Sequence, residues 1–158
     1  RIHGSGKSKH EVIRVGLNAR LDTIQAAVLL AKLEVFETEL VAREALAQLY
    51  DERLGDTVQL PGRNPSMTSA WAQYTIQIEH RDRVQEQLKT NGIPTAVYYP
   101  VPTHLQPAYQ AFGDGPGSLP HSERLARKVL SLPMHPYMDH ATAEQICDLL
   151  TMAVTNTH

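Results

Sequence analysis

The densest cluster of polar and aromatic side chains in the sequence runs from Tyr98 to Gln106 and includes Tyr99 and His104. It covers the end of a strand predicted at residues 93–99 and the loop after it, a frequent place for ligand contacts. An imidazole there can donate to a sugar hydroxyl or a carboxylate, or carry a proton near neutral pH. Neighbouring strand positions face opposite sides, so we expect one tyrosine in the core and the other free for a ligand. The alternative is that Tyr99 and His104 only close the loop.

A second polar pair, Asn18 and Arg20, lies in a short loop that runs directly into a long predicted helix. If that helix joins two bodies, the pair at its start is presented to a surface outside this chain. The alternative is an ordinary loop followed by an ordinary core helix.

The long helix is expected to begin at Asp22 or Thr23, because their side-chain oxygens suit the first free backbone N–H groups. Gly55 then supplies a stop after Leu54. Apolar residues recur at helical spacing, at Leu21, Ile24, Val28, Leu33, Phe36 and Leu40. About thirty residues of helix span about 45 Å, which is too long for one small domain to bury. We therefore expect the helix to bridge to a second domain or a second subunit.

The remainder of the chain predicts a small unit of mixed helices and strands. The expected elements are a strand at 70–78, a helix at 80–90, a strand at 93–99, a helix from Ser118 or Ser122 to Lys128, a strand at 129–133 and a last helix capped by Thr142. Strand, helix and strand in succession indicate a small sheet with helices packed on it. The chain is thus expected to divide into a long-helix arm, residues 1–55, and a compact α+β unit, residues 68–158.

The composition and the remaining motifs exclude several classes of function. A formal net charge of −2 implies no polyanionic partner, so we expect no nucleic-acid binding. The single cysteine, Cys147, excludes a disulfide framework and a cysteine-based zinc site, and its apolar helical neighbours indicate a core residue. No histidine pairs with another ligand at metal-site spacing, and no serine or cysteine nucleophile motif is present. No apolar run is long enough to cross a bilayer and no secretory signal is visible, so a cytoplasmic location is expected.

The run Gly6-Lys7-Ser8 lies in a basic N-terminal loop, residues 1–15, that also contains Lys9 and His10. It invites comparison with a phosphate-binding loop of nucleotide triphosphatases. The full motif requires a glycine five residues earlier, where this chain has Arg1, and a following helix, which is not predicted. A solvated loop explains the run better.

Several motifs, in the same order along the chain, resemble those of the DegT/DnrJ/EryC1/StrS sugar-nucleotide aminotransferases. The longest is the run from Gly16 to Leu33, GLNARLDTIQAAVLLAKL. The others are His3-Gly4, Ser69–Tyr74 (SAWAQY), Gly92–Thr95 (GIPT), Tyr98–Gln106 (YYPVPTHLQ) and Leu130–Met134 (LSLPM). This ordered set covers nearly the whole chain. SAWAQY and YYPVPTH most resemble the members that aminate a UDP-linked 3-keto-uronic acid for O-antigen synthesis.

The resemblance implies an α/β enzyme of fold type I that uses pyridoxal 5′-phosphate (PLP). In that family a long helix leaves a large domain and leads to a small α+β C-terminal domain. The lysine that forms the Schiff base lies in the large domain, upstream of the His-Gly motif. The lysines of this chain are Lys7, Lys9, Lys32, Lys89 and Lys128, and none stands at that position. The resemblance therefore implies the C-terminal part of such an enzyme, with no catalytic residue of its own and inactive alone.

The same resemblance implies roles for individual residues. Asn18 resembles the asparagine that reaches into the neighbouring subunit and binds the cofactor phosphate. Arg20 resembles a residue close to that site, where a guanidinium can fork onto a substrate carboxylate or phosphate. Tyr98, Tyr99 and His104 resemble the substrate-side loop.

The implied reaction is ping-pong transfer of an amino group from glutamate to a UDP-linked 3-keto sugar. The implied assembly is a homodimer that shares each site between its subunits. The alternative is a non-catalytic dimerisation or sugar-binding module derived from that family. No metal is implied by either reading.

Overall fold

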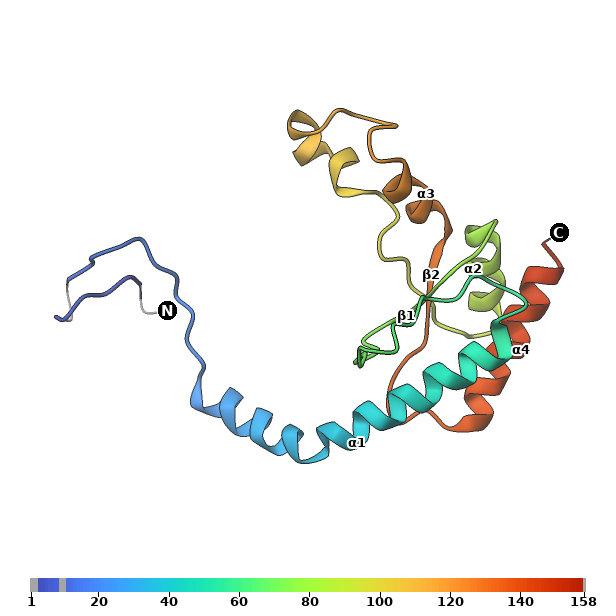
Figure 1. Cartoon of the computed structure of the whole chain (residues 1–158), viewed down its shortest axis with the longest axis horizontal. Coiled ribbons are helices and arrows are strands. Elements are labelled where there is room, and N and C mark those ends of the chain that lie inside the picture. The colour runs from blue at the N-terminus through green and yellow to red at the C-terminus, as the bar shows by residue number, and fades with distance from the viewer. Residues whose placement is uncertain (1–2, 9–10, 158) are drawn as a thin grey trace. The chain divides into compact units, whose positions relative to one another are not determined.

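The structure is a computed structural model that describes residues 3–8 and 11–157. Along the chain (Figure 1) its elements are α1 (Thr23–Leu54), β1 (Tyr74–Gln77), α2 (Arg81–Thr90), the 3₁₀ helices η1 (Thr103–Leu105) and η2 (Pro107–Phe112), α3 (Pro120–Lys128), β2 (Val129–Leu132) and α4 (His140–Thr155). The chain divides into two compact units, Arg1–Thr38 and Glu39–His158. The domains 1–55 and 68–158 stay a prediction, and Lys9 and His10 of the predicted basic loop lie outside the described residues.

Helix α1 has the predicted bounds, but its two halves differ in burial. It follows Asp22, whose backbone oxygen accepts a hydrogen bond from the Ala26 amide at 2.9 Å, and it ends before Gly55. In its first part the large apolar side chains are exposed, at Ile24, Val28, Leu29, Leu30, Leu33, Val35 and Phe36. In its last turns the buried residues are Leu46, Ala47, Tyr50 and Leu54. Among the described residues, only the second half of α1 contributes side chains to a hydrophobic core.

The sheet of the second unit consists of β1 and β2, paired antiparallel with Tyr74 opposite Leu132 and Gln77 opposite Val129. All four residues of β2 are buried, as expected for a strand that is covered on both faces. The strands predicted at 70–78 and 129–133 are confirmed in a shorter form. On the other edge of β1, the backbone of Gln59 pairs with that of Gln77 in an isolated antiparallel bridge.

The strand predicted at 93–99 is wrong. Only Ala96 pairs with β2, exchanging backbone hydrogen bonds with Ser131 at 3.1 and 2.7 Å. Pro94 has no N–H to donate, and Pro100 restricts the backbone of the residue before it, so a continuous ladder cannot form. The segment crosses the edge of β2 at one point and continues as irregular chain.

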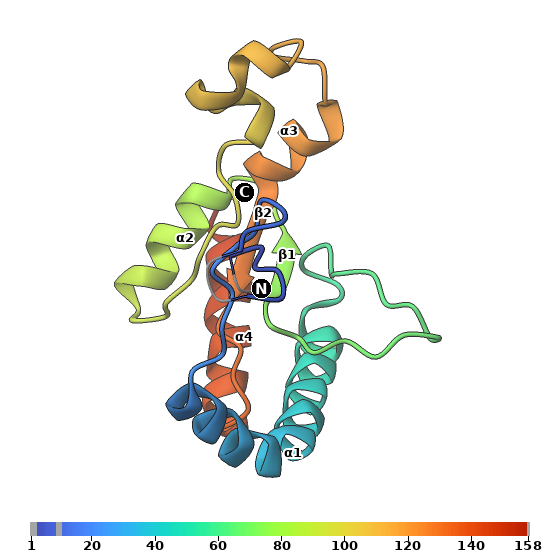
Figure 2. The same cartoon turned by 90° about the vertical axis from the view of Figure 1, so that its left-hand side faces the viewer.

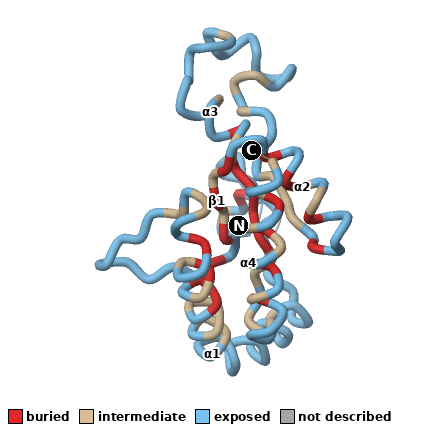
Figure 3. Tube along the Cα trace, turned by 90° about the vertical axis from the view of Figure 1, so that its right-hand side faces the viewer, coloured by how far each residue is buried: buried red, intermediate tan, exposed pale blue. Residues whose placement is uncertain are grey.

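The core of the second unit lies between the sheet, α2, α4 and the second half of α1, where Figure 3 shows the buried residues gathered. Its largest fully buried side chains include Tyr50, Tyr74, Leu130 and Ile146. Cys147 is 1% exposed, which confirms it as a core residue, and burial raises the pKa of its thiol to about 11. A thiol in that environment stays protonated near neutral pH and is chemically inert.

The last helix, α4, begins two residues before the predicted capping residue. Asp139 is the N-cap, and its carboxylate accepts hydrogen bonds from the amide (2.9 Å) and the hydroxyl (2.7 Å) of Thr142. The prediction that Thr142 caps the helix is therefore wrong, because Thr142 is the donor inside the first turn. Within residues 3–8 and 11–157, no helix has both the length and the apolar character needed to span a bilayer.

Candidate functional site

A groove of about 710 Å³ lies between the segment that contains Tyr98, Tyr99 and His104 and helix α3. Figure 2 shows η1, η2 and α3 lying together at one end of the second unit. The described residues that line the groove are Tyr98, Tyr99, Pro100, Val101, Pro102, Thr103, His104, Gln106, Leu119, Ser122, Leu125, Ala126 and Val129. The structure therefore brings the three predicted substrate-side residues to one surface.

Both tyrosines lie on the wall of this groove. Tyr98 is 44% exposed and Tyr99 is 72% exposed, and their rings meet edge to face with centroids 5.6 Å apart. The prediction that one of them is a core residue is wrong, because the segment is not a strand and its side chains do not alternate between two faces. Two phenol groups are thus free to contact a ligand.

His104 lies in η1 and its side chain is largely buried in the wall of the groove. Its Nε2 lies 3.1 Å from Oε1 of Glu123, which also accepts the amide of Gly117 at 2.7 Å. The hydrogen bond from His104 is the main reason that the pKa of Glu123 lies below its usual range. The imidazole therefore closes the loop onto α3 and also lines the groove, and its contact with a ligand stays a prediction.

The chemistry of the lining suits binding. The groove presents hydroxyl, amide and imidazole groups beside apolar side chains of α3, and none of the described lining residues is a carboxylate, a lysine or a cysteine. Hydroxyl and amide groups on an apolar wall fit a sugar ring. Among the described residues no three histidine, cysteine, aspartate or glutamate side chains gather at a metal site.

The first unit begins with a tight loop that leads to Asn18. Its backbone is closed by bonds from His3 N to Leu17 O (3.1 Å) and from Ile13 N to Gly4 O (3.0 Å). Gly4 has a φ of 74°, and a β-carbon there would lie 1.7 Å from the oxygen of Arg14, so only glycine fits.

The phosphate-loop hypothesis for Gly6-Lys7-Ser8 is wrong. The amide of Lys7 already donates to a carboxylate oxygen of Glu11 at 2.9 Å, and Gly6 N donates to Glu11 O at 2.8 Å. A phosphate-binding loop continues directly into a helix, whereas residues 11–22 contain none.

Asn18 and Arg20 follow this loop in the first unit, whereas the groove belongs wholly to the second. Both side chains are exposed, and among the described residues neither has a hydrogen-bond or ion-pair partner. An amide and a guanidinium with free donors are the groups that bind phosphate and carboxylate oxygens. This donor set fits the phosphate of an anionic cofactor or substrate.

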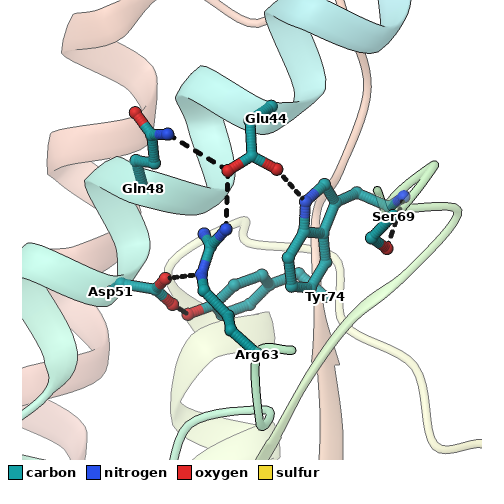
Figure 4. Close-up of polar contacts among 7 residues, drawn as sticks. Glu44, Gln48, Asp51, Arg63, Ser69 and Tyr74 are labelled. Atoms are coloured by element: carbon teal, nitrogen blue, oxygen red, sulfur yellow. Dashed lines mark hydrogen bonds and ion pairs between the residues drawn. The ribbon is translucent and has the colours of Figure 1, made fainter. Parts of the chain in front are cut away.

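A polar cluster that sequence analysis missed joins the second half of α1 to the loop before β1 (Figure 4). Arg63 pairs with Glu44 (Nη1–Oε1, 2.6 Å) and with Asp51, and Trp71 Nε1 donates to Glu44 at 2.6 Å. The Tyr74 hydroxyl donates to Asp51, and burial is the first reason that the pKa of this phenol is raised. The hydrogen bond from Trp71 is the largest factor that lowers the pKa of Glu44. Each charged group here has a partner, so the cluster fixes the loop against α1.

The profile of the DegT/DnrJ/EryC1/StrS aminotransferase family matches residues 1–151 of this chain. The chain belongs to this family. Its sequence is 45% identical over 150 residues to UDP-2-acetamido-2-deoxy-3-oxo-D-glucuronate aminotransferase of Pseudomonas aeruginosa, covering 94% of this chain and 41% of that protein.

Two solved structures superpose on the chain. The aminotransferase of this family from Brucella abortus has a TM-score of 0.88 at 47% identity and covers 94% of this chain and 40% of that one. NtdA from Bacillus subtilis, solved with bound cofactor PMP, has a TM-score of 0.85 at 26% identity and covers 97% of this chain and 37% of that one. The α+β fold with a long leading helix is therefore that of the family.

This chain spans about two fifths of the length of the relatives that it matches. The match includes the N-terminal loop, α1 and the second unit as far as residue 151, within α4. Asn18, Arg20 and the groove residues all lie inside the matched part.

Proposed function

We propose that the complete protein is a PLP-dependent aminotransferase that moves an amino group from glutamate to a UDP-linked 3-keto sugar. The observation that carries the proposal is the 45% identity to a P. aeruginosa aminotransferase of a UDP-linked 3-oxo sugar, over 94% of this chain. The groove supports it, because hydroxyl and imidazole groups on an apolar wall suit a sugar ring. We further propose that the product enters polysaccharide synthesis, such as O-antigen synthesis.

The residues of this chain would bind and orient the reactants. Bound PLP supplies the electron sink for amino transfer. The amide of Asn18 donates hydrogen bonds to the phosphate of PLP, and the guanidinium of Arg20 forks onto a substrate carboxylate or phosphate. Tyr98, Tyr99 and His104 hold the sugar. None of the chain's lysines is assigned to the Schiff base in this proposal, so the chain contributes binding and no nucleophile.

The proposed assembly is a homodimer in which Asn18 serves the cofactor of the other subunit. Two free donors on an exposed loop of the first unit are consistent with action on a group outside that unit. If Asn18 acts in this way, then dissociation of the dimer and loss of PLP are linked.

The direct test is amino transfer by the complete protein loaded with PLP. Glutamate and UDP-2-acetamido-2-deoxy-3-oxo-D-glucuronate are supplied, and 2-oxoglutarate and the UDP-amino sugar are measured by mass spectrometry. We expect both products in equal amounts, and less product from the corresponding dTDP sugar. A protein that binds PLP and UDP-sugar but forms neither product contradicts the proposal and leaves the non-catalytic sugar-binding module.

The Asn18→Ala substitution is expected to weaken PLP retention by roughly 1–3 kcal/mol, the cost of losing hydrogen bonds to a charged group. Equilibrium dialysis of the complete protein against PLP measures the change. Gln25→Ala is the matched control, because Gln25 is also an exposed amide of the first unit and has no partner among the described residues. Equal retention of PLP by the two variants would remove Asn18 from the cofactor site.

A further inference from the structure

The pair of His104 and Glu123 is a largely buried polar contact at the wall of the groove. The two side chains are 9% and 15% exposed, and Nε2 and Oε1 are 3.1 Å apart. The same carboxylate oxygen accepts the Gly117 amide at 2.7 Å. Glu123 lies in the first turn of α3, where the positive end of the helix dipole favours a carboxylate.

The chemistry of this contact fixes which nitrogen of His104 carries the proton. An ionised carboxylate only accepts hydrogen bonds, so the Nε2 that faces Glu123 must be the N–H donor. The lowered pKa of Glu123 agrees with an ionised carboxylate at neutral pH. In the neutral ring, Nδ1 is then an unprotonated acceptor.

The Nδ1 atom is available to a ligand. Among the described residues Nδ1 has no hydrogen-bond partner and is not one of the fully buried unpaired atoms, so it keeps some contact with solvent. Gly113 packs against the base of the His104 side chain, where an added β-carbon would lie 3.3 Å from the β-carbon of His104.

We propose that Glu123 is a positioning residue that holds His104 with Nε2 protonated, so that Nδ1 accepts a hydrogen bond from a hydroxyl or N–H of the bound sugar. This proposal rests on the proposed function, because it takes the ligand of the groove to be a nucleotide sugar. It adds Glu123, a residue of α3, to a site whose other predicted members all come from the segment before η2.

The first test is the tautomer of His104, measured by two-dimensional NMR of the imidazole nitrogens in the ¹⁵N-histidine-labelled chain. In the wild-type chain we expect His104 protonated at Nε2. In Glu123→Ala we expect a mixture of both tautomers, and in Glu86→Ala no change. Glu86 is the matched control, since its exposed carboxylate on α2 pairs only with Lys89 at 3.6 Å. A wild-type ring protonated at Nδ1 alone overturns the proposal even if Glu123→Ala does not fold, and so does an unchanged tautomer in a folded Glu123→Ala.

The second test is a double-mutant cycle in the complete enzyme. Glu123→Ala is expected to raise KM for the nucleotide sugar by roughly tenfold to a hundredfold, while the half-reaction with glutamate keeps its rate. If Glu123 acts through His104, then His104→Ala with Glu123→Ala loses no more than His104→Ala alone. Fully additive losses show that Glu123 acts independently and overturn the proposal. A wild-type enzyme without amino transfer contradicts only the proposed function, because the tautomer is measured without turnover.

Discussion

Trp71→Ala is expected to lower the free energy of unfolding by about 3–5 kcal/mol, the usual cost of removing a buried aromatic side chain. Trp71 is 8% exposed, and its ring lies 5.5 Å from that of Tyr74 and 4.8 Å from the guanidinium carbon of Arg63. Its indole N–H also donates to Glu44 at 2.6 Å. Alanine removes all of these contacts at once and leaves a cavity beside the sheet.

Urea unfolding followed by circular dichroism measures this loss. Tryptophan fluorescence does not serve, because Trp71 is the only tryptophan and the variant lacks the signal. Trp71→Phe is the control: it keeps most of the packing but loses the hydrogen bond to Glu44, so we expect about 1–2 kcal/mol. A Trp71→Ala chain that unfolds at the wild-type urea concentration with an unchanged m-value would show that the aromatic cluster adds no stability.

Arg81→Ala is expected to destabilise the fold by roughly 2–4 kcal/mol, because it leaves buried carbonyl oxygens without a donor. The Arg81 side chain is 7% exposed and donates from Nη1 to the backbone oxygens of Val129 (3.0 Å) and Ala126 (3.3 Å). These carbonyls lie at the end of α3 and the start of β2. Arg81 therefore connects α2 to the junction of α3 and β2, whose residues Ala126 and Val129 line the groove.

Arg83→Ala provides the matched control for this experiment. Arg83 is on the same helix, two residues further along, and its side chain is exposed with no partner among the described residues. Its removal is expected to change stability by less than about 0.5 kcal/mol. If thermal or urea unfolding shows equal losses for the two variants, the buried carbonyl contacts of Arg81 are energetically unimportant.

Local patterns predicted the parts of the fold that local energies determine. The ends of α1, marked by Asp22 and Gly55, and the paired strands β1 and β2 follow from capping preference and β-branched or aromatic runs. No continuous strand forms at 93–99, because Pro94 and Pro100 override the strand preference of its apolar residues. Thr142 has the residue type of a cap, but the better acceptor, Asp139, lies three residues earlier, where the sequence predicts a loop.

The sequence predicts the residues of the candidate groove that are continuous in sequence, and it does not predict the contact that depends on tertiary structure. Tyr98, Tyr99 and His104 lie within seven consecutive positions, and the structure places all three on one groove. Glu123 is 19 residues from His104, and no spacing rule links them. The one available signal was an acidic residue in the first turn of a helix that begins with Pro120. The roles of Asn18 and Arg20 stay predictions from family resemblance, since their exposed side chains have no partner among the described residues.

Helix α1 is one hydrogen-bonded element with two sources of stability. Opening the turns around Tyr50 and Leu54 exposes core side chains, so that end opens only together with the second unit. The turns around Leu33 and Phe36 have mainly their own backbone bonds, and an isolated helix of that length is marginal in water. Any surface that covers those apolar side chains therefore also stabilises the helical state, so binding and local folding are thermodynamically linked in the first half of α1.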